Sequence, residues 1–162
     1  MDIGIFDEFL KPKLYFDTVR FAQDKARYKW GEYDHQYAPP TGVVADFTDN
    51  LIYPFDKIVE ATRPYIPDNL SLKRIYINCF APKEIPTWHT DSSVPGHKTT
   101  LIYLSTTNWS LENGGETQFW DKISIKGIPP IPNRCIIFPS EIIHRATSFN
   151  NNWRFSLATK WE

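Results

Sequence analysis

The chain is poor in the features that would place it in several broad classes of protein. Its 162 residues include only two cysteines, Cys79 and Cys135, and neither has the C-x-x-C spacing of a zinc or redox pair. No apolar run reaches the roughly 18 residues that a membrane span requires, and residues 1–10 carry acidic side chains where a secretory signal needs basic ones. We therefore expect a soluble, unprocessed protein of the reducing cytoplasm.

An excess of charge is missing as well. The chain has 18 Lys and Arg residues against 19 Asp and Glu residues, and neither sign forms a long run. Nothing in this balance favours nucleic acid or a membrane as a partner, so we expect a small molecule or a peptide. The hydrophobic content of 41% is enough for one core, which predicts a single domain over residues 1–162.

Residue spacing divides the chain into a helical support with the first strand, 1–66, and a strand-rich segment, 67–162. The first part contains a short strand at 3–6, a helix at 12–29 that begins with Pro12, and a weaker helix at 53–63. The second contains short β-rich runs at 72–80, 99–105, 116–120, 123–128, 134–138, 142–148 and 153–161. Strands this closely spaced, joined by Gly, Pro and Asn, predict an antiparallel sandwich or barrel.

The predicted strand 72–80 has one apolar face and one mixed face. The apolar face carries Ile75, Ile77 and Cys79, and the mixed face carries Arg74, Tyr76, Asn78 and Phe80. A plain sandwich would leave the mixed face in water, whereas two sheets closed over it would form an interior lined for a ligand. The strand pattern by itself leaves both arrangements open.

Three residues form a candidate metal site. His89 and Asp91 are two residues apart, so both side chains lie on one side of an extended segment. His144 lies in an apolar, strand-like run and completes a set of two imidazoles and one carboxylate. Such a set on one face of an octahedral ion suits non-haem Fe(II), although catalytic zinc can use the same ligands.

Arg154 favours iron over zinc. It follows His144 after a turn through three asparagines, and its guanidinium can reach the same cavity on the mixed face. A buried guanidinium needs an anionic partner, which a dicarboxylate cosubstrate would supply. Ser156 lies on the same face and Tyr103 lies in a neighbouring predicted strand, so both could add hydroxyl donors to that carboxylate.

These motifs together resemble a known family. The runs are Asn78-Cys79-Phe80, Trp88-His89-Thr90-Asp91, Thr100-Leu101-Ile102-Tyr103-Leu104, Gly114-Gly115-Glu116-Thr117-Gln118-Phe119, Phe138, His144 and Arg154-Phe155-Ser156. Their order over residues 72–161 resembles the 2-oxoglutarate/Fe(II)-dependent oxygenases, and most of all the prolyl 4-hydroxylase-like branch.

The resemblance implies a mainly β fold, a double-stranded β-helix or cupin-like jelly-roll barrel with supporting N-terminal helices. It implies iron held by His89, Asp91 and His144, with 2-oxoglutarate and O₂ as cosubstrates and ascorbate as a candidate reductant. Arg154 would bind the far carboxylate of 2-oxoglutarate with help from Tyr103 and Ser156, and Tyr76 and Asn78 are further candidate contacts. Related halogenases lack the carboxylate at the position of Asp91, so its presence favours hydroxylation.

The expected reaction is hydroxylation of an aliphatic C–H bond with oxidative decarboxylation of 2-oxoglutarate to succinate and CO₂. The branch suggests a peptidyl, prolyl-type side chain, and the same chemistry on a free amino acid or small metabolite is the alternative. Collagen-type relatives use Lys where this chain has Arg154, whereas oxygen-sensing relatives use Arg. Nucleic-acid dealkylases carry a second Arg after it, where this chain has Lys160. A cupin-like binder without enzymatic activity would not need Arg154.

Two further expectations concern residues around the predicted site. His35 and His97 sit among turn-forming residues and are expected to face solvent. Residues 81–98 surround the H-x-D motif and are rich in proline and polar residues, which predicts a mobile loop at the site entrance.

Overall fold

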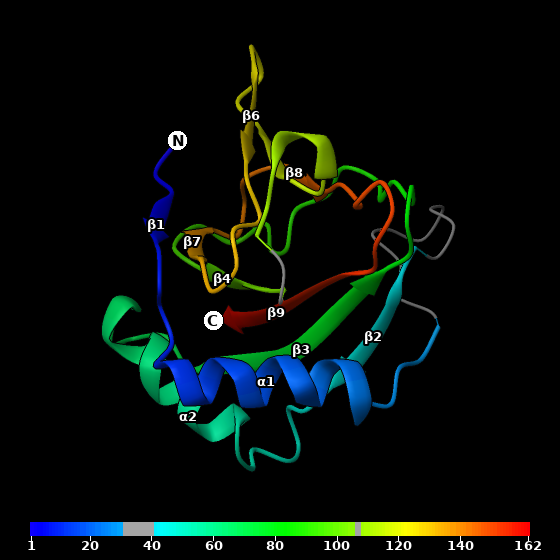
Figure 1. Ribbon diagram of the computed structural model, residues 1–162. Coiled ribbons are helices and arrows are strands. Elements are labelled where there is room, and N and C mark those ends of the chain that lie inside the picture. Colours follow the sequence, from blue (N-terminus) through cyan, green and yellow to red (C-terminus); the bar gives the residue numbers. More distant parts are fainter. Residues whose placement is uncertain (31–40, 106–107) are drawn as a thin grey trace.

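The computed structural model describes residues 1–30, 41–105 and 108–162, and its strands form two sheets that pack face to face (Figure 1). The larger sheet has the strand order β1-β7-β4-β9-β3-β2, and the smaller one has the order β6-β5-β8. The strands are β1 (Gly4–Phe6), β2 (Val43–Asp46), β3 (Leu72–Phe80), β4 (Lys98–Leu104), β5 (Thr117–Trp120), β6 (Ile125–Ile128), β7 (Cys135–Pro139), β8 (His144–Ala146) and β9 (Arg154–Trp161). Each pairing within the two sheets is antiparallel, which agrees with the predicted jelly-roll barrel.

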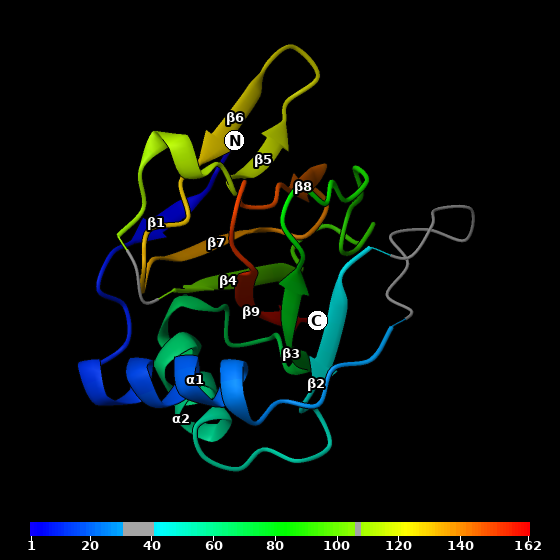
Figure 2. The same cartoon turned by 45° about the vertical axis from the view of Figure 1, so that its right-hand side comes forward.

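Two helices, α1 (Pro12–Asp24) and α2 (Phe55–Thr62), cover the outer face of the larger sheet (Figures 1 and 2). The 3₁₀ turns η1 (Arg63–Tyr65) and η2 (Leu111–Asn113) follow α2 and precede β5. Proline is tolerated in the first turn of α1 because the N–H groups there have no partner within the helix. The buried residues of α1 recur at helical spacing and face the sheet; they are Tyr15, Thr18, Val19 and Ala22.

The alternation along β3 explains how the two faces of the larger sheet are used. Ile75 and Ile77 belong to the core between this sheet and the helices, together with Phe55, Ile58 and Leu157. Tyr76 belongs to a second core between the two sheets, together with Leu101, Phe119, Phe138 and Ala158. The smaller sheet therefore covers the mixed face, which lines an interior instead of meeting water.

Some predicted boundaries differ from the structure. The predicted strand 72–80 is β3, whereas the predicted strand 142–148 contracts to β8 and the predicted helix 12–29 ends at Asp24. Lys29 instead pairs with Val44 in a single antiparallel bridge. Strand β2 was not predicted, because four residues without alternation carry no strand signal of their own. Within the described ranges, no helix is both long and apolar enough to cross a membrane.

Candidate metal and cosubstrate site

The two histidines of the predicted metal site are brought together by a single β-bridge. His89 lies in the segment between β3 and β4 and pairs with His144, the first residue of β8. The backbone N–H of His89 donates to the His144 carbonyl at 3.0 Å, and the reverse bond is 2.9 Å long. The centroids of the two rings are consequently 4.6 Å apart.

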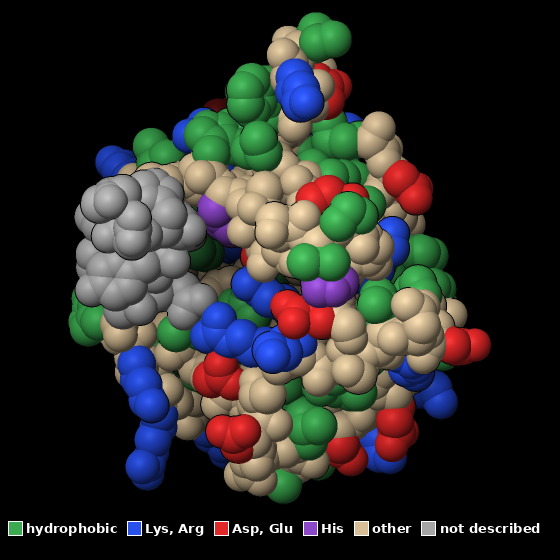
Figure 3. Space-filling view, turned by 180° about the vertical axis from the view of Figure 1, so that it is seen from behind, with side chains coloured by type: hydrophobic (Ala, Val, Ile, Leu, Met, Phe, Trp, Pro, Cys, Tyr) green, Lys and Arg blue, Asp and Glu red, His purple; other side chains and the backbone are tan. Residues whose placement is uncertain are grey.

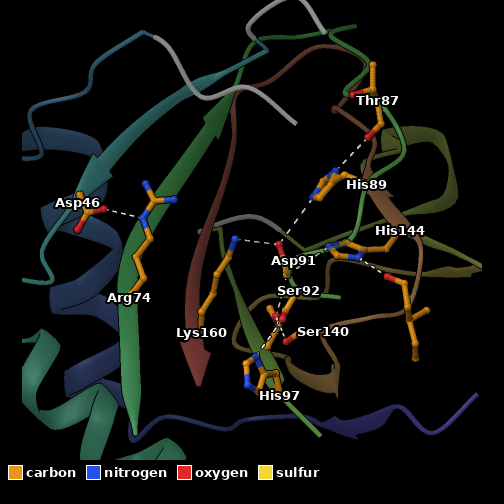
Figure 4. Close-up of polar contacts among 12 residues, drawn as sticks. Asp46, Arg74, Thr87, His89, Asp91, Ser92, His97, Ser140, His144 and Lys160 are labelled. Carbon is orange, nitrogen blue, oxygen red and sulfur yellow. Dashed lines mark hydrogen bonds and ion pairs between the residues drawn. The ribbon is translucent and has the colours of Figure 1, made fainter. Parts of the chain in front are cut away.

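Asp91 points its carboxylate at both imidazoles (Figure 4). Its Oδ2 lies 3.5 Å from Nε2 of His144, and its Oδ1 lies 3.9 Å from Nε2 of His89. The backbone N–H of Asp91 donates to the carbonyl of Ser140 at 2.9 Å, which anchors the segment beside β7. One ligand atom from each of the three residues lies within 4.8 Å of the others, so one ion could meet all three.

Hydrogen bonds orient both rings for metal binding. Nδ1 of His89 lies 3.1 Å from the Thr87 carbonyl, and Nδ1 of His144 lies 2.8 Å from the Ile142 carbonyl. A carbonyl only accepts, so Nδ1 carries the proton and Nε2 presents its lone pair towards Asp91. Burial lowers the pKa of His144, which favours the neutral ring that a metal requires. The donor set therefore fits a divalent metal such as Fe(II).

Two residues that the sequence analysis did not assign to the site support Asp91. Thr99 donates a hydrogen bond of 2.7 Å to Oδ2, and the Lys160 ammonium lies 3.0 Å from Oδ1. Burial alone would raise the pKa of Asp91, but the favourable electrostatics of the neighbouring His144 and Lys160 and the bond from Thr99 outweigh it and lower the pKa to about 2. Alternation along β9 could have indicated from the sequence that Lys160 belongs to the site, because Lys160 shares a face with Arg154 and Ser156.

Arg154 is the first residue of β9 and is only 1% exposed. Its guanidinium donates to the Gly115 carbonyl at 2.9 Å, to the Ser156 hydroxyl at 3.2 Å and to the Thr117 hydroxyl at 3.0 Å. All three acceptors are neutral, and no carboxylate among the described residues forms an ion pair with Arg154. Burial lowers the pKa of Arg154, yet a guanidinium stays charged at neutral pH. The site therefore holds a buried cation suited to an anionic ligand.

A cavity of about 130 Å³ joins the metal triad to Arg154, and Ser156, Tyr76 and Asn78 also line it. Figure 3 shows the surface hollowed near its centre, with Lys and Arg side chains along the lower edge of the hollow. Tyr103 is not among the lining residues. Its hydroxyl donates to Thr117 at 2.8 Å, Thr117 accepts from Arg154 as well, and the Arg154 guanidinium lies 5.5 Å from the centroid of the Tyr103 ring.

The remaining histidine predictions have different outcomes. His97 is half-buried, and its Nδ1 lies 2.9 Å from the Ser92 hydroxyl, so it faces solvent less than expected. His35 lies outside the described residues. Residues 81–97 contain no helix or strand, apart from the His89 bridge; their mobility remains a prediction.

The fold is similar to that of solved structures at low sequence identity. A Pseudomonas putida prolyl 4-hydroxylase superposes with a TM-score of 0.75 at 13% identity, covering 99% of this chain and 91% of the other. A Trichoplax adhaerens prolyl hydroxylase, solved with a peptide of hypoxia inducible factor, superposes with a TM-score of 0.77 at 14% identity. The match covers 98% of this chain and 82% of the other. A non-haem α-ketoglutarate-dependent epimerase of nogalamycin biosynthesis superposes with a TM-score of 0.67 at 12% identity. The match covers 99% of this chain and 77% of the other. These likenesses confirm the double-stranded β-helix fold.

Sequence comparison assigns the family. No curated protein matches the chain. The model of the 2OG-Fe(II) oxygenase superfamily matches residues 76–161, which is more than half of the chain and includes the His89, Asp91 and His144 cluster and Arg154. The chain therefore belongs to the 2OG-Fe(II) oxygenase superfamily.

Proposed function

We propose that this protein is a 2-oxoglutarate-dependent dioxygenase that hydroxylates an aliphatic C–H bond. The observation that carries the proposal is that His89, Asp91 and His144 converge on a cavity whose wall holds a buried Arg154 without a carboxylate partner among the described residues. A metal triad alone would serve many functions. The added buried cation supports a cosubstrate with a carboxylate, since an unpaired buried charge is costly.

His89, Asp91 and His144 would hold Fe(II), and the bonds from Nδ1 of both histidines to backbone carbonyls keep the Nε2 atoms aimed at it. When bound, Fe(II), 2-oxoglutarate and O₂ supply the oxidation, in which 2-oxoglutarate loses CO₂ to become succinate and one oxygen atom enters a C–H bond of the substrate. Thr99 donates to Asp91 and so restrains the carboxylate that must meet the metal. These residues are preorganised by their own hydrogen bonds.

Arg154 would bind the far carboxylate of 2-oxoglutarate. The Ser156 hydroxyl accepts from Arg154, so its own proton can point to the same carboxylate. Burial raises the pKa of Tyr103 to about 12, so its hydroxyl stays protonated and continues to donate to Thr117. Tyr103 would thus act through Thr117 by holding the acceptor of Arg154 in place, while Tyr76 and Asn78 remain candidate contacts in the cavity wall.

For the substrate, we propose a peptidyl, prolyl-type side chain. The resemblance of the motifs to the prolyl 4-hydroxylase-like branch supports it, as does the likeness of the fold to two prolyl hydroxylases. A free amino acid or another small metabolite is the second candidate. The small cavity, which both Arg154 and Lys160 line, favours that candidate.

The proposed reaction can be tested by the formation of succinate. Protein loaded with Fe(II) is incubated with 2-oxoglutarate and a pool of peptides or metabolites, and succinate is measured together with any substrate mass gain of one oxygen atom. We expect succinate, and a mass shift in one of the two pools decides between the substrate classes. Absence of succinate with every pool, together with no effect of Arg154→Ala on 2-oxoglutarate binding, would favour a non-enzymatic cupin-like binder.

A further inference from the structure

We propose that the substrate carries a carboxylate and that Lys160, beside Asp91 in the cavity wall, binds this carboxylate. The inference rests on the proposed oxygenase function and specifies the substrate class for that same site. It starts from the two basic residues that β9 presents to the cavity.

Strand geometry separates these two cations. Arg154 and Lys160 lie on the same face of β9, because side chains two residues apart point to the same side. At about 3.3 Å per residue, their backbones lie roughly 20 Å apart along the strand. A dicarboxylate held between the metal triad and Arg154 has its far carboxylate at Arg154, so Lys160 is not needed for that carboxylate and can bind another ligand.

Lys160 has one carboxylate partner among the described residues, and that partner is the proposed metal ligand Asp91. The Lys160 side chain is 21% exposed, and Asp91 is the one carboxylate of the described residues within ion-pair distance of its ammonium. Its other close neighbour is the ring of Tyr76, whose centroid lies 5.6 Å from Nζ. An ammonium has three donors, so the contact with Asp91 leaves donors that can face the cavity.

A second cation, Arg74, lies next to Lys160 but has a carboxylate partner of its own. Arg74, whose contact with Asp46 is drawn in Figure 4, is the cross-strand partner of Lys160. Its guanidinium lies 4.0 Å from the centroid of the Tyr76 ring. Like charges directly opposite each other destabilise a sheet, and here Asp46 pairs with Arg74 at 2.6 Å. The negative charge of Asp46 therefore compensates the positive charge of Arg74, whereas the carboxylate next to Lys160 is that of Asp91.

Counted over the described residues, the charges of the loaded site do not balance without a further anion. The charged groups of these residues that line the cavity are Asp91, Arg154 and Lys160, with both histidines neutral as ligands. A divalent metal and doubly charged 2-oxoglutarate cancel each other, and Asp91 balances Arg154. Lys160 leaves one positive charge in a largely buried place, which is unfavourable. A carboxylate on the substrate would neutralise it.

The test measures binding, using protein loaded with Zn(II) and 2-oxoglutarate so that no turnover occurs. The probes are the common free L-amino acids and their carboxamides, together with blocked peptides containing Asp or Glu and the matching Asn or Gln peptides. Affinities are measured by ligand-observed NMR titration for the unaltered protein and for Lys160→Met and Lys160→Arg. Lys126→Met, at an exposed position of β6, is the matched control.

We expect at least one acid to bind about tenfold more tightly than its amide, because a charge-assisted hydrogen bond is lost in the amide. Lys160→Met should remove this preference, while Lys160→Arg and Lys126→Met keep it. The pool that contains the preferred acid shows whether the carboxylate belongs to a free amino acid or to a peptide side chain.

Equal affinity of acids and amides throughout both pools would overturn the inference. So would a Lys160→Met protein that weakens acids and amides alike or loses Zn(II), since Lys160 would then only position Asp91. Failure of the proposed oxygenase function looks different, because that protein would neither bind 2-oxoglutarate nor form succinate.

Discussion

His89 and His144 face each other across one antiparallel bridge, with backbone bonds of 3.0 and 2.9 Å and ring centroids 4.6 Å apart. Their spacing depends on backbone pairing, and each ring is oriented by its own Nδ1 bond. The metal site should therefore be well formed before the metal binds.

Replacing either histidine by alanine should weaken metal binding more than about 100-fold, because loss of an outer-shell partner alone costs 10- to 100-fold. Isothermal titration with Co(II) or Fe(II) under anaerobic conditions measures the effect. His97→Ala is the control, since His97 bonds to Ser92 outside the triad. Unchanged affinity in His89→Ala or His144→Ala would mean that the ligands are misassigned.

Thr99→Val should reduce metal affinity by about tenfold, because Asp91 loses the donor that restrains Oδ2. The adjacent Thr100→Val is a matched control, since Thr100 is buried and bonds to Thr159 on the other face of the sheet. We expect that control to change the free energy of unfolding without changing metal affinity. Equal metal affinity in both variants would contradict a role for Thr99 in the site.

Arg154→Ala should raise the 2-oxoglutarate concentration needed for half-maximal succinate formation by about 100-fold, since removing one partner of a buried charged pair costs several kcal/mol. The metal affinity should stay close to that of the unaltered protein. Arg134→Ala removes a surface pair with Asp7 and should leave the 2-oxoglutarate requirement unchanged. A similar shift in both variants would show a general loss of structure.

Gly115→Ala should lower the free energy of unfolding by at least about 2 kcal/mol. The backbone of Gly115 has a φ of +85°, and an added Cβ would lie 2.5 Å from the ring of Phe149. Gly96→Ala separates the cost of the positive φ from the cost of the clash, because its φ is +92° and nothing lies within 4 Å of the added atom. Urea denaturation of both variants should show the larger loss for Gly115→Ala, and equal losses would exclude the clash.

Both cysteines should resist thiol reagents in the folded protein. Burial raises the pKa of Cys79 to about 12 and also raises the pKa of Cys135. At pH 8 both thiols are then protonated, and a protonated thiol reacts slowly. Ellman's reagent should label neither residue until urea unfolds the chain. Rapid labelling without urea would place at least one of them at the surface.

Much of the fold and of the candidate site could be predicted from residue types and their spacing over short segments. The alternation over residues 72–80 predicted both faces of β3, since side chains of a strand point alternately to opposite sides. The H-x-D spacing put His89 and Asp91 on one side of their segment, and the expected burial of Arg154 on the mixed face predicted an anionic partner. These properties depend on neighbouring residues only.

Other features depend on which distant segments become neighbours. Pairing of β3, β4 and β9 places Thr99, Tyr76 and Lys160 around one cavity, although nothing in their local runs connects them. The short β2 acquires its strand conformation only from its partner β3.

The sequence by itself therefore determined a strand-rich antiparallel fold and predicted the metal triad and the cation for the cosubstrate, because residue type and alternation act over a few residues. Only the tertiary structure decided that the smaller sheet covers the mixed face, that the bridge from His89 to His144 closes the triad, and that Lys160 meets Asp91. The physical reason is that the cross-strand register, set by long-range hydrogen bonds and packing, decides which side chains touch.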